Sequence, residues 1–83
     1  MHMNNSKAYY TLTNKRSELE EEFDVMTEVI RNIQADAKKL KKGSIERQDL
    51  IRRANELKNS ESYKDLKLQI KTLNFCINTV FYS

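Results

Sequence analysis

The sequence has almost none of the residues that interrupt helices: it contains no proline and a single glycine, Gly43. Disordered chains are usually richer in these breakers and poorer in large aliphatic residues. Charged residues make up 33% of this chain and hydrophobic residues 39%, a balance that favours a folded protein over a disordered one. We therefore predict a folded and almost wholly helical protein.

Cysteine and histidine are nearly absent as well. Cys76 is the only cysteine, so no disulfide can form within the chain, and His2 is the only histidine. A structural zinc site needs four Cys, His or acidic ligands close together, and a nucleophilic cysteine needs a neighbouring base. We therefore expect Cys76 to be a buried, inert thiol, and we expect no catalytic residue, no metal and no cofactor. The protein is predicted not to be an enzyme.

Long hydrophobic runs are also missing. No stretch approaches the ~20 apolar residues of a membrane-spanning helix, and the polar start of the chain lacks the apolar core of a signal peptide. A single unpaired cysteine suits a reducing compartment, so we expect a cytoplasmic protein without a membrane span. Residues 1–5 are predicted to be a disordered N-terminus or a cloning scar, because Met1-His2-Met3 is typical of one.

What the chain does have is an apolar stripe along its first half. Its members recur at alternating spacings of three and four residues, which is the heptad pattern of a helix that buries one narrow seam. They are Leu19, Phe23, Met26, Ile30, Ile33, Ala37 and Leu40, with an extension back to Leu12 and Tyr9. Arg16 interrupts the stripe. A polar residue in such a seam can set register or oligomeric state, or it can reach out to solvent.

Local signals predict where this first helix begins and ends. Ser17 and Glu20 fit a capping box, yet the stripe continues upstream of them. Either a short separate helix precedes Ser17 or a single helix starts near residue 6, and we favour the single helix. Gly43 is the residue type most easily placed just after a helix C-terminus. The first helix is therefore predicted at about residues 6–42.

Two further helices are expected after Gly43. Ser44 can cap the first of them, at about residues 44–58. Ser62 and Asp65 form another start signal, which places the last helix at about residues 62–82. Alternating apolar residues in this last segment would also suit a strand. A strand of ~20 residues would be far longer than an ordinary one, so we predict a helix.

The lengths of these segments predict the architecture. The arms on either side of Gly43 are nearly equal, and a tight connection makes neighbouring helices antiparallel. We predict an all-α fold, either an antiparallel helical hairpin or a three-helix bundle with a long heptad-patterned first helix, and residues 6–83 form its single domain. A core of this size contributes only roughly 3–5 kcal/mol, and association with a partner or with itself commonly supplements it.

Two groups of side chains are candidates for binding. The first surrounds the predicted turn and is basic: Lys38, Lys39, Lys41, Lys42, Arg47, Arg52 and Arg53. Such a group can contact phosphates or an acidic protein surface, although lysines near a helix C-terminus also complement the helix dipole. The second is the apolar C-terminal segment, which we predict to form a protein interface through Phe75, Ile77, Val80, Phe81 and Tyr82.

These features favour a small non-enzymatic regulatory protein that docks helices onto a larger protein and inhibits or modulates it. The composition is rich in Asn, Lys and Ile and lacks proline, as AT-rich genomes tend to encode, so we expect a phage or bacterial accessory factor. Its expected partners are a protein target and further copies of the chain. The alternative is a nucleic-acid-binding accessory protein that uses the basic turn.

Overall fold

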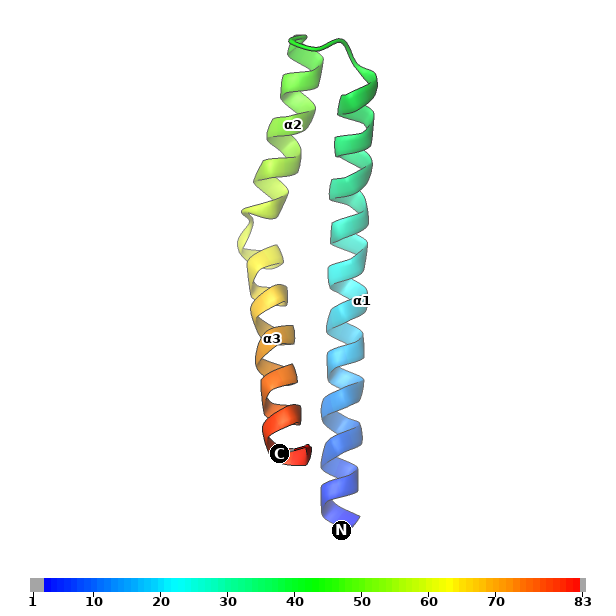
Figure 1. Ribbon diagram of the computed structural model, residues 1–83, viewed down its shortest axis with the longest axis vertical. Coiled ribbons are helices and arrows are strands. Elements are labelled where there is room, and N and C mark those ends of the chain that lie inside the picture. The colour runs from blue at the N-terminus through cyan, green and yellow to red at the C-terminus, as the bar shows by residue number, and fades with distance from the viewer. Residues whose placement is uncertain (1–2, 83) are drawn as a thin grey trace.

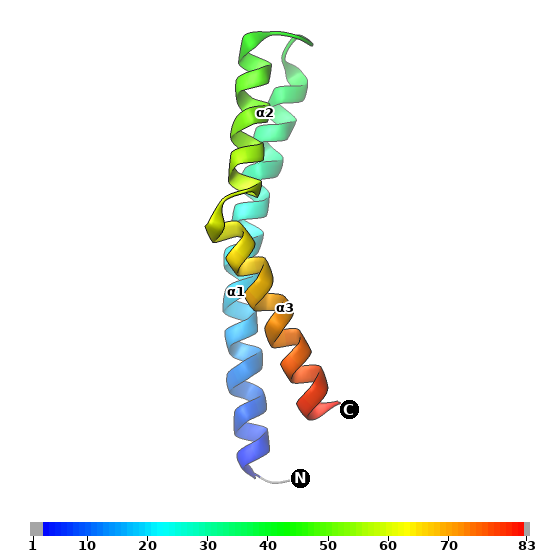
Figure 2. The same cartoon turned by 90° about the vertical axis from the view of Figure 1, so that its left-hand side faces the viewer.

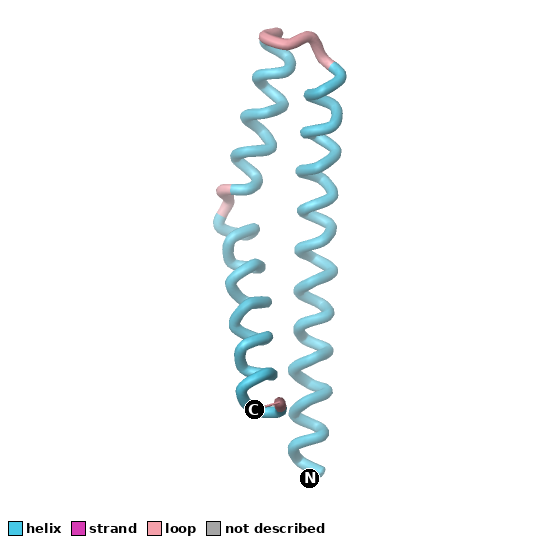
Figure 3. Tube along the Cα trace, in the orientation of Figure 1, coloured by secondary structure: helices cyan, strands magenta, loops and turns pink. Residues whose placement is uncertain are grey.

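The fold is a helical hairpin whose second arm is broken in two. The computed structural model describes residues 3–82, with α1 at Met3–Lys39, α2 at Ile45–Lys58 and α3 at Glu61–Phe81. α2 and α3 follow one another along α1 and run antiparallel to it (Figure 1). Residues 3–82 contain no strand, as the tube trace in Figure 3 shows. The predicted all-α hairpin is thus confirmed, and the strand alternative for the last segment is wrong.

The molecule is a rod. Its principal extents are 61 × 18 × 16 Å and its radius of gyration is 18.1 Å, whereas a compact chain of this length has a radius of gyration of about 12 Å. The turn lies at one end of the rod, and the outer ends of α1 and α3 lie at the other. Figure 2 shows α3 crossing α1 obliquely, so that the end of α3 lies to one side of α1.

α1 passes through Ser17 without interruption, so the predicted capping box at Ser17 and Glu20 does not form. A cap needs free backbone N–H groups, and in the middle of a helix these groups already bond to carbonyl groups four residues back. The single continuous helix is confirmed, and it starts at Met3 instead of near residue 6. Residues 3–5 therefore belong to α1. The disordered terminus or cloning scar predicted for Met1 and His2 lies outside the described residues.

The turn between α1 and α2 is longer than predicted, because α1 ends at Lys39 and not at about residue 42. α1 ends at Lys39, and two backbone bonds close the connection: Leu40 N–H to the Ala37 carbonyl at 3.1 Å and Ser44 N–H to the Lys41 carbonyl at 3.0 Å. Gly43 has φ +86°, which glycine adopts readily because it has no Cβ. Ser44 caps α2 as predicted, since its Oγ accepts from the N–H of Arg47 at 3.3 Å.

The break between α2 and α3 is short, and Ser60 starts α3. The Oγ of Ser60 accepts from the N–H of Tyr63 at 3.3 Å and donates to the Leu57 carbonyl at 2.7 Å. The predicted bounds of about 62–82 agree with α3 to within one residue, but the predicted cap at Ser62 is wrong, because Ser62 already lies in the first turn of α3. Ser60 has the extended backbone that an N-cap needs, with φ −65° and ψ 148°.

The core is the seam between α1 and the broken arm. Its buried members are Leu19, Ile30 and Ala37 of α1, Ala54 of α2, and Leu66 and Ile77 of α3. Near the middle of the rod the rings of Phe23 and Tyr63 stack, with centroids 4.8 Å apart. The predicted apolar stripe of α1 is thus the seam of the hairpin, and it leaves the other sides of each helix open.

Candidate interaction surfaces

Aromatic rings gather where the outer ends of α1 and α3 meet. We call this group the aromatic end; it comprises Tyr9, Tyr10, Phe75, Phe81 and Tyr82, five of the seven aromatic residues of the chain. The ring of Tyr9 packs edge-on against Phe81, with centroids 5.2 Å apart, and against Tyr10 at 5.8 Å. The hydroxyl groups of Tyr9 and Tyr82 are hydrogen-bonded to each other. The two arms are therefore joined at this end by ring packing and by a polar contact.

The residues predicted as a protein interface divide into exposed and buried sets. Phe75, Val80 and Tyr82 are 70%, 67% and 64% exposed. Phe81 is half-buried against Tyr9, and Ile77 is 1% exposed because it packs in the seam. Ile77 follows the buried Leu66 by eleven residues, or three helical turns, so both face α1. Three of the five residues are accessible to a partner.

The interface prediction overlooked Tyr9 and Tyr10, which belong to the same end of the rod. Tyr9 had been placed only in the apolar stripe, and Tyr10 is 65% exposed. Tyr9 and Tyr82 are 73 residues apart in the chain. An antiparallel hairpin of two equal arms brings its outer ends together, so equal arm length was the signal that could have joined these residues.

The contact between Tyr9 and Tyr82 alters the acidity of Tyr82. The hydrogen bond from Tyr9 raises the pKa of Tyr82 above its ordinary value of 10.0. Partial desolvation and the charge of an ionised Tyr9 act in the same direction, while the positive charge of Arg16 opposes them. The neutral phenol is therefore the form that this end of the fold favours.

The opposite end of the rod is the basic tip, which we define as the predicted set Lys38, Lys39, Lys41, Lys42, Arg47, Arg52 and Arg53. Part of its charge is compensated locally. Arg52 lies 2.9 Å from Asp49 and 3.9 Å from Glu56, and Lys39 lies 3.8 Å from Asp36. None of the seven residues of the basic tip is aromatic. The tip itself therefore offers no ring on which a base of a single-stranded nucleic acid could stack.

Arg16 bridges the two arms. Its Nη1 donates to Oδ1 of Asn74 at 2.9 Å, and its Nε lies 3.4 Å from Oε1 of Glu20. Arg16 therefore makes a specific contact across the seam, which fits a role in setting the register of the arms better than a side chain that only reaches out to solvent. This contact lies on one side of the hairpin, which also carries the exposed carboxylate of Glu20.

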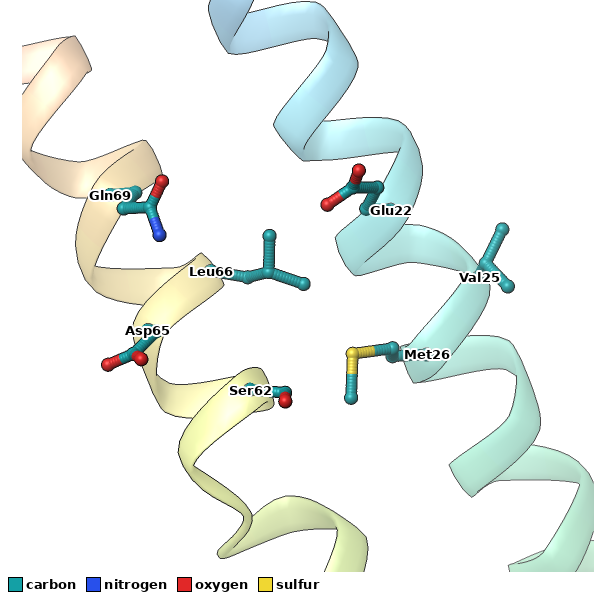
Figure 4. A pocket seen from close by; sticks show the side chains of 7 residues that line it. All are labelled: Glu22, Val25, Met26, Ser62, Asp65, Leu66 and Gln69. Carbon is teal, nitrogen blue, oxygen red and sulfur yellow. The ribbon is translucent and has the colours of Figure 1, made fainter.

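The other side of the hairpin, which we call the groove face, carries a groove between α1 and α3 that continues along the outer end of α1 alone. It consists of three successive depressions. Lys7, Ala8, Thr11 and Leu12 line the outer one; Lys15, Leu19, Leu68, Gln69, Thr72 and Leu73 line the middle one; Glu22, Val25, Met26, Ser62, Asp65, Leu66 and Gln69 line the inner one. In Figure 4 Leu66 and Met26 point toward each other across the inner depression.

The three depressions form one continuous face. Ala8, Lys15 and Glu22 each line a different depression and are spaced by seven residues, so they lie on the same side of α1. Gln69 lines both the middle and the inner depression. From Lys7 to Met26 the face extends over about five turns of α1, and α3 contributes apolar side chains to its middle and inner depressions.

Residues 3–82 hold no group of three or more His, Cys, Asp or Glu side chains that could bind a metal ion. Across the same residues, no helix combines the length and the apolar character needed to cross a lipid bilayer. Cys76 is a free thiol, and it is exposed. The prediction of a buried thiol was wrong because Ile77, the next residue, takes the seam position and turns Cys76 away from it.

Comparisons with protein families, with curated proteins and with solved structures found no match for this chain. A functional proposal therefore depends on the surfaces of the hairpin: the aromatic end, the basic tip and the groove face.

Proposed function

We propose that this protein is a non-enzymatic interaction protein that docks its aromatic end onto a larger protein and thereby inhibits or modulates it. The observation that carries the proposal is the exposure of Phe75, Val80 and Tyr82 on the last turns of α3. Phenylalanine and tyrosine are enriched at protein interfaces, and aromatic anchors often contribute much of the binding energy. A phage or bacterial accessory factor acting in the reducing cytoplasm, where Cys76 stays free, fits this proposal.

Part of the aromatic end is held in place before any partner binds. The rings of Tyr9 and Phe81 pack together, and the hydrogen bond between Tyr9 and Tyr82 restrains the C-cap residue of α3. A surface that is ordered in advance loses less conformational entropy on binding. The partner that suits it has an apolar concave surface able to receive an exposed phenyl ring.

The basic tip is a separate surface. It lies at the far end of a rod that is 61 Å long (Figure 1). A target bound at the aromatic end would contact the basic tip only if it were about as long as the rod. A smaller acidic target can still be steered by the long-range electrostatic field of the tip during approach.

A point substitution tests the proposal better than a truncation. Removing the residues after Leu73 would also remove Ile77 and Phe81, which hold α3 on α1. Phe75→Asp changes an exposed side chain of the aromatic end, and Ile45→Asp is the matched control, because Ile45 is 76% exposed near the turn.

The experiment compares three immobilised proteins: wild type, Phe75→Asp and Ile45→Asp. Proteins retained from lysate of the expressing cells are identified by mass spectrometry, and the strongest candidate is purified for calorimetric titration. We expect wild type and Ile45→Asp to bind with equal affinity and Phe75→Asp to bind at least about tenfold more weakly, since loss of an anchor costs 1–2 kcal/mol or more. Equal affinity for all three proteins would remove the aromatic end from the proposal.

The second candidate is a nucleic-acid-binding accessory protein that uses the basic tip. Lys38, Lys41 and Lys42 at the turn favour it. The ion pairs described above for the basic tip compensate the charges of Lys39 and Arg52, which leaves these three lysines as the candidates for phosphate contacts. Phosphate contacts release counterions, so affinity would fall steeply with salt concentration. Filter binding to duplex and single-stranded DNA at several salt concentrations tests this, and Lys41→Ala/Lys42→Ala should reduce the slope. A flat salt dependence would exclude this candidate.

A further inference from the structure

The two sides of the hairpin differ in chemistry. Lys15 and Arg16 are consecutive, so they flank the seam at Leu19 on opposite sides. Arg16 points to the side on which it bonds Asn74 and faces Glu20, whereas Lys15 lines the groove face. The groove face is the more apolar side, and its Leu68 and Val25 are 62% and 64% exposed.

The hairpin also exposes more surface than a compact chain of its size. Its accessible area is 6746 Å², whereas a compact monomer of 9.9 kDa exposes about 5200 Å². The excess is about 1500 Å². For comparison, a standard interface buries ~800 Å² of each partner, and an obligate dimer buries ~1000–2500 Å² of each partner. The groove face runs from Lys7 to Met26, about 30 Å of the 61 Å rod, so covering it would remove part of this excess.

The charges on the groove face are arranged so that the face complements itself. Lys7 and Lys15 lie in the outer half, and Glu22 and Asp65 lie in the inner half. Two-fold rotation about an axis between Lys15 and Glu22 places the basic half of one copy on the acidic half of the other. The same rotation brings Leu12 of one copy and Val25 of the other to the same height along the paired helices, on opposite flanks of the line through Lys15 and Glu22. The charged positions are therefore matched in the antiparallel pair.

We propose that the groove face is the interface of a two-fold dimer in which α1 of one copy packs antiparallel to α1 of a second copy. Lys15 of each copy then lies opposite Glu22 of its partner, and the two hairpins form a four-helix bundle in their overlapping part. The two proposals use different residues, since the depressions of the groove face are lined without Phe75 and Tyr82, although both follow Leu68 at intervals of seven residues on the same side of α3.

The mass of the full chain in solution is the first test. Sedimentation equilibrium and light scattering at about 100 µM, where a complex with micromolar Kd is nearly saturated, should give twice the chain mass of 9.9 kDa. Leu68→Asp, which alters an exposed residue of the groove face, should give a monomer with unchanged helicity. Ile45→Asp, which alters a residue that is 76% exposed and lies near the turn, should remain a dimer.

A charge exchange tests the antiparallel register. In Lys15→Glu homodimers two acidic residues face each other twice, and in Glu22→Lys homodimers two basic residues do so. Each variant should therefore dimerise at least about tenfold more weakly than wild type. An equimolar mixture of the two variants restores both opposite-charge pairs, so the mixture should form a heterodimer with affinity close to that of wild type.

Three results would overturn the proposal. One is a monomeric wild-type protein at about 100 µM, which would leave the groove face to a different partner. Another is a dimer that Leu68→Asp leaves intact or that Ile45→Asp disrupts, because the interface would then lie elsewhere. The third is a mixture of Lys15→Glu and Glu22→Lys that stays monomeric although each variant is folded, which contradicts the antiparallel register. Binding of a target by the aromatic end is measured separately and is not decided by any of these results.

Discussion

The guanidinium group of Arg16 crosses the helical seam to the side-chain amide of Asn74, with 2.9 Å between Nη1 and Oδ1. Arg16 is the position at which the apolar stripe of α1 is interrupted, so a polar residue on one arm meets a polar residue on the other. Sliding the arms by one turn would place the side chain of Arg16 against a different residue of α3 and break this bond. The pair therefore favours one register of the hairpin, as single polar residues do in other helical seams.

Removal of Asn74 should destabilise the hairpin, whereas removal of Arg16 should not. Asn74→Ala deprives a half-buried guanidinium group of its acceptor, and we expect a loss of about 1 kcal/mol in the free energy of unfolding, because Glu20 and water still solvate the charge. Arg16→Leu extends the apolar stripe and should leave stability equal or higher. Urea denaturation measures both, with Asn78→Ala as the exposed control on α3. Equal stability of Asn74→Ala and Asn78→Ala would contradict the prediction.

The start of α3 can be checked by substituting two nearby serines. Ser60→Ala removes the hydroxyl group that accepts from the N–H of Tyr63, and we expect a loss of about 1 kcal/mol, the usual cost of losing an N-cap. Ser62→Ala should change stability by less than about 0.5 kcal/mol, because Ser62 is exposed in the first turn of α3. Thermal unfolding followed by circular dichroism distinguishes the two. A larger loss for Ser62→Ala would mean that α3 starts where the sequence signal placed it.

Thr27 offers a way to stabilise the protein. Its hydroxyl oxygen is buried and has no hydrogen-bond partner among the described residues. Thr27→Val keeps the shape of the side chain and removes the unsatisfied group, so the free energy of unfolding should rise by about 1 kcal/mol. Thr13→Val is the control, because the Thr13 hydroxyl already donates to the Tyr10 carbonyl at 3.2 Å. Denaturant titration should show a gain for Thr27→Val and none for Thr13→Val; equal effects would indicate that burial of the Thr27 hydroxyl costs nothing.

The aromatic end should weaken at high pH. Because its hydrogen bond with Tyr9 raises the pKa of Tyr82 above 10.0 in the folded protein, Tyr82 binds its proton more tightly in the folded than in the unfolded chain. Its contribution to stability is therefore complete below the unfolded pKa and disappears as pH rises through the folded pKa. Stability measured by denaturation across this range should fall less steeply for Tyr82→Phe than for wild type. Tyr10→Phe, which lacks this bond, should follow wild type, and a wild-type slope for Tyr82→Phe would rule out the bond as the cause.

The architecture was predictable because the periodicity of apolar residues carries it. Leu19, Ile30 and Ala37 are members of the predicted stripe, and all three are buried. Gly43 and Ser44 mark the turn with residue types whose backbone and side-chain preferences are strong. Equal arms around a single glycine leave few alternatives to an antiparallel hairpin.

The details that failed depend on choices that local sequence leaves open. Ser60 and Ser62 both precede suitable residues, and only the path of the chain after α2 decides which one caps α3. Ser17 has the side chain of a cap, yet the helix continues through it because the apolar pattern on both sides is in phase. Cys76 and Ile77 are adjacent residues and both are apolar. A shift of one residue in helical phase decides which of the two is buried. The groove face itself could not be predicted, because it requires the relative rotation of two helices.

The arms meet at a single turn. The sequence separation between two residues in contact across the seam therefore increases with their distance from the turn. The separation is 58 residues for Arg16 and Asn74, and 73 for Tyr9 and Tyr82. Closing a longer loop costs more entropy, and short-range contacts form earlier in folding. We therefore expect the hairpin to fold from Gly43 outward and to open from the aromatic end inward. A partner bound there would hold shut the segment that opens first, and so slow hydrogen exchange at the amides of both outer ends.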